Sequence, residues 1–258
     1  MAFKLCALRS GSRGNATLIM TDKTAMLVDC GISLSSLKSE LGAFNLTPSD
    51  LDCVLITHEH NDHVSGLNKI AVSAPLICHD LTYAEIRNKI GYEPKRIEIK
   101  NFDLGFEVGD VTVQPFRIPH DAAYPVGYSF YNGGEKIAIA TDIGHINDGI
   151  VNNLKGCNLL LLESNYDEKM LLNGTYPYYL KKRILGNRGH LSNADSSLLL
   201  KRVFSDRLEI LLLGHISKEN NTPEFVLDSA NKTLKELNSS VSAYALSQTK
   251  KSLLFEVK

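Results

Sequence analysis

Residues 57–63 read Thr-His-Glu-His-Asn-Asp-His and follow an apolar run that predicts a β-strand. Side chains alternate along extended backbone, so His58 and His60 should point the same way. Asp62 and His63 follow at once, where we expect a helix to begin. Imidazoles and a carboxylate at this spacing suit Zn²⁺, Mn²⁺ or Fe²⁺. The motif therefore predicts a metal site at a strand end; a solvated histidine-rich turn is the alternative.

Three more metal-competent side chains follow strand-like runs. His120 comes after VTVQPFRIP, Asp142 after KIAIAT and His215 after EILLLG. Sheets of α/β proteins place functional groups at their strand ends. We therefore expect all three to join the 57–63 motif, although each alone would more often be a turn or core residue.

The rest of the sequence predicts many strands with helices inserted between them. Strands are predicted at residues 3–8, 16–21, 25–29, 53–57, 96–99, 105–108, 111–118, 127–131, 136–141, 158–163, 208–214 and 253–257. Helices are predicted at residues 35–43, 80–90, 177–185, 193–204 and 224–237. This order suggests an α/β fold with two sheets between helices, an αββα four-layer sandwich. Without a repeat, linker or composition shift, we expect one domain over residues 1–258.

The composition is that of an ordinary globular protein: 43% hydrophobic and 22% charged residues in a chain of 258. A formal net charge of −1 provides no global attraction for polyanions, so a nucleic acid would need local basic patches and metal. Five cysteines without a CxxC pair indicate reduced thiols. No signal-like start or membrane-length apolar run is present, so we expect a cytoplasmic protein without a membrane partner.

The motif THEHNDH, followed in order by the three later ligand candidates, resembles the signature of the metallo-β-lactamase superfamily. This resemblance implies the four-layer fold and two divalent ions as cofactors. One ion would be bound by His58, His60 and His120, the other by Asp62, His63 and His215, and Asp142 would bridge them. An aspartate at the bridging position is typical of the phosphodiesterase and thioester-hydrolase branches. Zn²⁺ is the expected metal, with Mn²⁺ or Fe²⁺ as alternatives.

Finer motifs are similar to those of the YycJ/WalJ-like proteins across nearly the whole chain. They are SGSRGNA (10–16), VDCG (28–31), PHDAAYPVGY (119–128), LLESNYD (161–167), RGHLSN (188–193) and LGHISKENNTPE (213–224). The resemblance implies metal-dependent phosphodiester hydrolysis, with 5′ to 3′ exonuclease action on DNA.

Catalysis would need a nucleophile and a proton donor. Metal coordination lowers the pKa of water from about 15.7 towards 7, so a metal-bridging hydroxide would attack phosphorus. His190 is the candidate general acid for the leaving alkoxide, and Glu163 at a strand end would orient it. This pair is similar to a Glu–His pair of related RNA-processing enzymes; a helix-capping role is the alternative for His190. Together with Asp62, these residues form the predicted catalytic set.

Further polar residues are expected around the site. By resemblance, Asp29 lies behind the metal-binding histidines and would fix an imidazole tautomer; a turn-forming role is the alternative. The resemblance also places beside the site a polar loop that contains Ser10, Ser12 and Asn15. Gly11 and Gly14 would let its backbone amides approach a phosphate.

A basic and aromatic segment precedes the proposed general acid. It contains Lys181, Lys182, Arg183, Arg188, Tyr176, Tyr178 and Tyr179. Such a mixture suits backbone neutralisation and base stacking on a single strand or a DNA end. A solvated helix face is the alternative.

Two other functions are compatible with these residues. A small-molecule hydrolase could use the same centre on a cyclic phosphodiester, a lactone or a thioester. A non-catalytic regulatory or scaffold protein could keep the fold, but it would have no reason to keep every ligand. The oligomeric state is not indicated.

Overall fold

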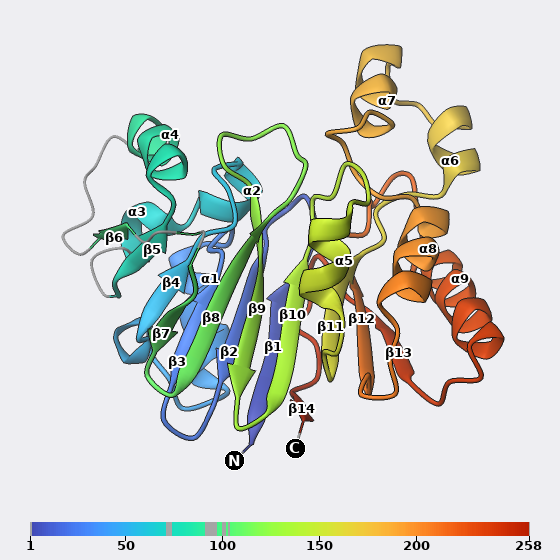
Figure 1. Ribbon diagram of the computed structural model, residues 1–258. Coiled ribbons are helices and arrows are strands. Elements are labelled where there is room, and N and C mark those ends of the chain that lie inside the picture. Colours follow the sequence, from blue (N-terminus) through green and yellow to red (C-terminus); the bar gives the residue numbers. More distant parts are fainter. Residues whose placement is uncertain (1, 71–73, 91–96, 100–101, 103, 258) are drawn as a thin grey trace.

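Two β-sheets of seven strands each lie face to face in the described part of the chain, with helices on their outer faces (Figure 1). The computed structural model describes residues 2–70, 74–90, 97–99, 102 and 104–257. The predicted αββα sandwich is confirmed.

The first sheet is built from the N-terminal strands and the last strand of the chain, in the order β14-β1-β2-β3-β4-β5-β6. Its strands are β1 (Phe3–Arg9), β2 (Ala16–Met20), β3 (Ala25–Val28), β4 (Cys53–Leu55), β5 (Leu76–Cys78), β6 (Ile97–Ile99) and β14 (Phe255–Val257). Strands β3 to β6 pair in parallel, whereas β14, β1, β2 and β3 pair antiparallel.

The second sheet has the order β13-β12-β11-β10-β9-β8-β7. Its strands are β7 (Phe106–Val108), β8 (Val111–Arg117), β9 (Val126–Asn132), β10 (Glu135–Ala140), β11 (Leu159–Glu163), β12 (Ile210–Gly214) and β13 (Ser242–Ala245). Strands β10 to β13 pair in parallel, and β7 to β10 pair antiparallel.

Helices cover the outer face of each sheet. The helices are α1 (Leu34–Gly42), α2 (Asn61–Val64), α3 (Leu67–Ile70), α4 (Asp80–Ile90), α5 (Asp148–Leu154), α6 (Glu168–Asn173), α7 (Tyr178–Ile184), α8 (Asn193–Val203) and α9 (Pro223–Glu236), with a 3-10 turn η1 (Pro48–Asp50). Apolar side chains of α1 to α4 pack on the first sheet, and those of α5, α8 and α9 pack on the second. Helices α6 and α7 project beyond the sandwich at the top of Figure 1.

Successive side chains of a strand point to opposite faces of its sheet, so the strands contribute to three apolar layers, one between the sheets and one on the outer face of each sheet. In β11, Leu159 and Leu161 point into the space between the sheets, and Leu160 and Leu162 point toward the helices. Because both faces are buried, this strand reads as a continuous apolar run instead of an alternating one.

Several short elements were not predicted. The local sequence gives only a weak indication of secondary structure in these elements, which are strands β5 and β13, turn η1 and helices α3, α5 and α6. Helix α5 contains Gly149 and two asparagines, which are poor helix formers, but Ile150, Val151 and Leu154 are buried against its neighbours. Tertiary packing, and not helix propensity, therefore stabilises helix α5. Residue 96 of the predicted strand 96–99 lies outside the described residues.

The topology brings several strand ends to one edge of the sandwich. Parallel β3 and β4 end beside each other in one sheet, and parallel β10, β11 and β12 do so in the other. The residues that follow these strands include most of the predicted site. Among the described helices, none combines the length and hydrophobicity that crossing a bilayer requires.

Candidate metal centre

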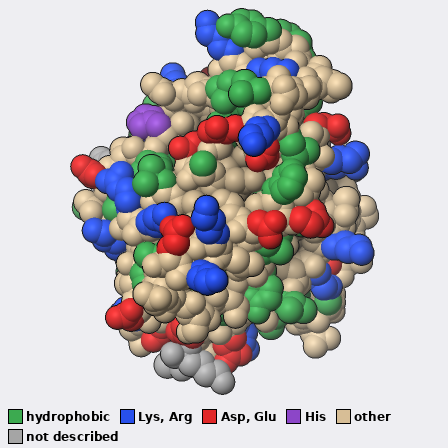
Figure 2. Space-filling model, turned by 90° about the vertical axis from the view of Figure 1, so that its right-hand side faces the viewer, with side chains coloured by type: hydrophobic (Ala, Val, Ile, Leu, Met, Phe, Trp, Pro, Cys, Tyr) green, Lys and Arg blue, Asp and Glu red, His purple; other side chains and the backbone are tan. Residues whose placement is uncertain are grey.

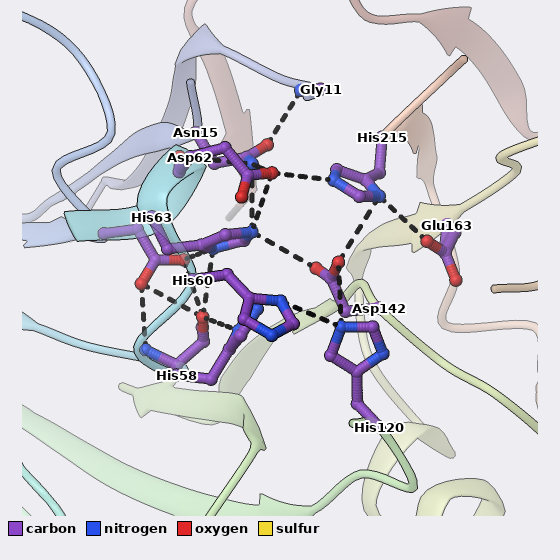
Figure 3. A network of polar contacts seen from close by, with 12 residues as sticks. Gly11, Asn15, His58, His60, Asp62, His63, His120, Asp142, Glu163 and His215 are labelled. Atoms are coloured by element: carbon purple, nitrogen blue, oxygen red, sulfur yellow. Dashed lines mark hydrogen bonds and ion pairs between the residues drawn. The ribbon is translucent and has the colours of Figure 1, made fainter. Parts of the chain in front are cut away.

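The seven predicted metal ligands lie together where strands of both sheets end (Figure 3). Six of them form two groups of three, and the metal-competent atoms within each group lie within 4.8 Å of one another. The groups are His58, His60 and His120, and Asp62, His63 and His215. Segments far apart in sequence therefore converge as the motifs predict.

Asp142 stands between the two groups. Its Oδ1 lies 3.8 Å from His120 Nε2, and its Oδ2 lies 3.5 Å from His63 Nε2. One carboxylate thus presents an oxygen to each group, which is the arrangement that a bridging ligand needs.

Unusual backbone geometry at three residues directs their side chains toward the site. Asp29, Asp142 and His215 have φ angles of 61°, 61° and 54°, a left-handed region that is uncommon among non-glycine residues. Each directly follows or closely follows a strand. Among the described non-glycine residues, the others with positive φ are Asn45 and Asn238. Strained backbone is therefore concentrated at the site, as is common where geometry serves function.

Asp29 lies behind the 57–63 loop, as predicted. Its buried carboxylate accepts hydrogen bonds from His63 Nδ1 at 2.8 Å and from the Thr57 amide at 2.8 Å. Because Nδ1 faces Asp29, Nε2 of His63 points into the site, where it lies 3.0 Å from Asn15 Nδ2.

Glu163 orients two histidines. Its Oε1 accepts from His190 Nδ1 at 2.8 Å and from His215 Nδ1 at 2.9 Å, and the side chain is fully buried. Its Oε2 accepts from the amides of Ile143 and Leu191. The contact with His190 was predicted, whereas the contact with His215 was not. Ser192 and not His190 caps helix α8, so the capping alternative does not apply.

The electrostatics of the centre favour cations. Burial opposes ionisation of Asp62, but His63 and His215 outweigh it and lower the pKa of its carboxyl group. Burial likewise opposes charge on His63, yet Asp29, Asp62 and Asp142 raise its pKa to about 9. His58 differs, because burial and neighbouring histidines hold its pKa well below the ordinary value. A buried neutral imidazole is a good metal ligand.

Two buried atoms show that the residues fit a metal. His58 Nε2 and Asp142 Oδ2 make no hydrogen bond within the described structure, although both are shielded from solvent. Buried polar atoms are almost always hydrogen-bonded, so atoms that are left over need another partner. A divalent cation would satisfy both atoms, and the mixed imidazole and carboxylate set matches Zn²⁺, Mn²⁺ or Fe²⁺.

The polar N-terminal loop lies beside the centre, and several of its polar groups form hydrogen bonds within the protein. Ser10 Oγ accepts from the His215 amide at 2.9 Å, and Asn15 Nδ2 lies 3.3 Å from Asp62 Oδ2. The Gly11 amide donates to Asn15 Oδ1, and the Gly14 amide donates to the Gly11 carbonyl. The amides of Gly11 and Gly14 thus have partners within the protein, and the approach of the loop's other backbone amides to a phosphate stays a prediction. Ser12 does line the metal cleft.

The residues of the predicted basic segment make different contacts. Lys181 donates to the carbonyls of Leu172 and Gly174, so it ties α7 to α6 instead of projecting toward a substrate. Arg183 lines the cleft and forms a two-pronged ion pair with Asp121. Lys182 and Arg188 are exposed.

Two acidic residues beside the metal-binding histidines were not predicted from the sequence. Asp121 lies 3.3 Å from His120 Nε2 and carries the ion pair from α7. Glu59 is buried, and its Oε1 accepts from the Ala123 amide at 2.8 Å, which joins the loops that hold His60 and His120. The signal for both was their position inside the motifs, between or beside the histidines.

The centre opens into a cleft of about 220 Å³. Its walls carry metal-site residues on one side and residues of the α6–α7 segment on the other. They include Asp62, Asp142, His190, His215, Tyr176 and Arg183. A substrate could therefore contact the metal-binding groups and His190 at once.

This fold and this histidine–aspartate centre are those of the metallo-β-lactamase superfamily. The sequence matches the family model described as Beta-lactamase superfamily domain over residues 24–216. The chain resembles the metallo-β-lactamase fold protein YhfI from Bacillus subtilis, with a TM-score of 0.76, 16% identity and 99% coverage of each chain.

Two curated relatives match over most of their length. Exodeoxyribonuclease YycJ of Bacillus anthracis is 35% identical, covering 92% of this chain and 90% of that protein. Exodeoxyribonuclease WalJ of Streptococcus pneumoniae is 37% identical, covering 87% and 85%. The chain belongs to the β-lactamase superfamily, in the group that contains YycJ and WalJ. The predicted family is confirmed, as is the metal-dependent hydrolase class.

Asp29→Asn should lower affinity for Zn²⁺ by about 10–100-fold, because the His63 ring loses its ionised partner. Asparagine tolerates the left-handed backbone at this position. Affinity is measured by competition with a chromophoric chelator. The control is Asp52→Asn, which alters another carboxylate that accepts a backbone amide. Equal affinity in the two variants would exclude a role for Asp29 at the metal.

Gly31→Ala should displace the metal-binding loop. A Cβ at this position would lie 1.6 Å from the Asp62 carbonyl oxygen, so the loop must move. We expect a loss of about 1–3 kcal/mol in unfolding free energy together with a reduced metal content. Gly42→Ala is the control, because a Cβ there meets nothing within 4 Å. A normal metal content in Gly31→Ala would contradict this packing argument.

Proposed function

We propose that the chain is an exodeoxyribonuclease that works with two divalent cations. The observation that carries this proposal is the pair of three-residue groups with Asp142 between them, in a chain 35–37% identical to exodeoxyribonucleases over most of its length. By this proposal one group binds each ion, and Asp142 contacts both. Zn²⁺ is the metal we expect, with Mn²⁺ and Fe²⁺ as alternatives.

Cations at this centre would supply Lewis acidity toward phosphoryl oxygens and would activate water at neutral pH. The remaining steps fall to the chain itself. Asp62 and His215 hold their positions through Asn15, Ser10 and Glu163, so the ligands are fixed before substrate arrives. Such preorganisation avoids rearrangement during the reaction.

His190 is the proposed proton donor. Its Nδ1 is hydrogen-bonded to Glu163, which leaves Nε2 as the atom available in the cleft. Asp142 Oδ1 lies 3.8 Å from His190 Nδ1, so the ring stands beside the proposed metal ligands. A proton delivered from Nε2 would neutralise the leaving alkoxide, and the carboxylate of Glu163 would stabilise the charged imidazolium between turnovers.

The substrate that we propose is DNA, as a single strand or an end, cleaved in the 5′ to 3′ direction. Helix α7 supports this through Tyr178 and Tyr179, which are 80% and 74% exposed, and through Lys182. Apolar and basic side chains stand side by side on the projecting part of the molecule in Figure 2. Exposed aromatic rings and cations suit stacking of bases and neutralisation of phosphates.

His190→Ala should keep both ions but reduce turnover of a phosphodiester by roughly 10²–10⁴-fold, because the leaving group loses its acid. His145→Ala is the control, since this exposed histidine bonds the Asn187 carbonyl and does not line the cleft. Steady-state rates and metal content are measured for both variants. An unchanged kcat in His190→Ala would remove this residue from the mechanism.

Digestion of end-labelled DNA tests the function itself. We expect shortening of single-stranded DNA or of duplex ends that stops after exhaustive chelation and returns when one divalent metal is restored. A 5′ label should appear first in mononucleotides. Activity that survives chelation, or hydrolysis of a lactone or thioester with none on DNA, would contradict the proposal.

A further inference from the structure

A second cleft lies against the metal cleft. Its volume is about 350 Å³, compared with about 220 Å³ for the metal cleft. Ile216 and Ser217 line both clefts, and the adjacent residues Ser12 and Arg13 each line one of them. The two clefts therefore share a rim made of two short segments.

The shared rim is tied to the metal centre. Ser10 accepts from the amide of His215 and donates its own amide to the Ser247 carbonyl. Gln248 Nε2 donates to the Ile216 carbonyl at 2.7 Å. A Cβ on Gly11 would lie 2.6 Å from Gln248 Cγ, so this side chain packs directly on the N-terminal loop. The position of the second cleft relative to the ligands is thus fixed.

The lining of the second cleft combines apolar surface with two cations. Ile216, Pro223 and Leu246 supply apolar surface, and Arg13 and Lys218 are exposed at its border. Neither cation forms an ion pair with the described residues. A ligand that carries both an apolar ring and a negative charge would match this lining, and a nucleotide has both.

We propose that the second cleft is a nucleotide subsite of the DNA strand, next to the cleaved linkage. The base would rest on the apolar wall, and Arg13 and Lys218 would hold phosphates that flank it. This inference rests on the proposed exonuclease function. Of the described residues that line the cleft, none comes from α6 or α7, so the contact is separate from any made by α7.

The test compares the double variant Arg13→Ala/Lys218→Ala with the control Lys38→Ala/Lys235→Ala, which removes two exposed cations elsewhere. With a single-stranded oligonucleotide, KM should rise by roughly tenfold or more in the first variant. The effect on bis(p-nitrophenyl) phosphate, which has no neighbouring nucleotide, should be much smaller. The slope of log affinity against log salt should fall by about 1.4, since two phosphate contacts each contribute about 0.7.

The outcomes separate the two proposals. An oligonucleotide KM and salt slope equal to those of the control, with a normal unfolding temperature, would overturn the subsite and leave the exonuclease proposal intact. An equal loss on both substrates would also overturn the subsite, because it would locate the effect at the metal centre. A wild-type protein that cleaves bis(p-nitrophenyl) phosphate but no DNA would overturn both.

Discussion

Burying histidines and carboxylates between two sheets is costly unless their polar atoms find partners, and this constraint organises the whole site. Asp29 and Glu163 satisfy the outward nitrogens of His63, His190 and His215. Of the atoms that face inward, His58 Nε2 and Asp142 Oδ2 make no hydrogen bond in the described structure. The protein thus fixes the rings from behind and leaves their inner faces for cations.

The fold supplies this arrangement by ending parallel strands of both sheets at one edge. Left-handed backbone at Asp142 and His215 then turns the chain sharply, so that short loops present their side chains inward. Close packing limits which residues the turns can contain. Gly31 lies against the Asp62 carbonyl, and even one methyl group would not fit there. Strain and tight packing at these turns are tolerated because the two buried sheets hold the strands in place.

Much of this could be predicted from the sequence. The 57–63 motif and the apolar runs before His120, Asp142 and His215 predicted seven residues that the structure brings together, because metal-competent residues at strand ends are a local pattern. Partners that depend on distant packing were harder to foresee. The second contact of Glu163, with His215, joins neighbouring strand ends 52 residues apart. Helix α5 was missed because burial and not helix propensity stabilises it.

The most direct test of the metal centre is anomalous diffraction at the zinc absorption edge from crystals of the reconstituted protein. Two peaks are expected per chain, about 3.5–4 Å apart, one beside His58, His60 and His120 and the other beside Asp62, His63 and His215. Asp142 should approach both peaks. No peak at this edge of the sandwich, or a single ion bound by other side chains, would contradict the proposed two-cation centre.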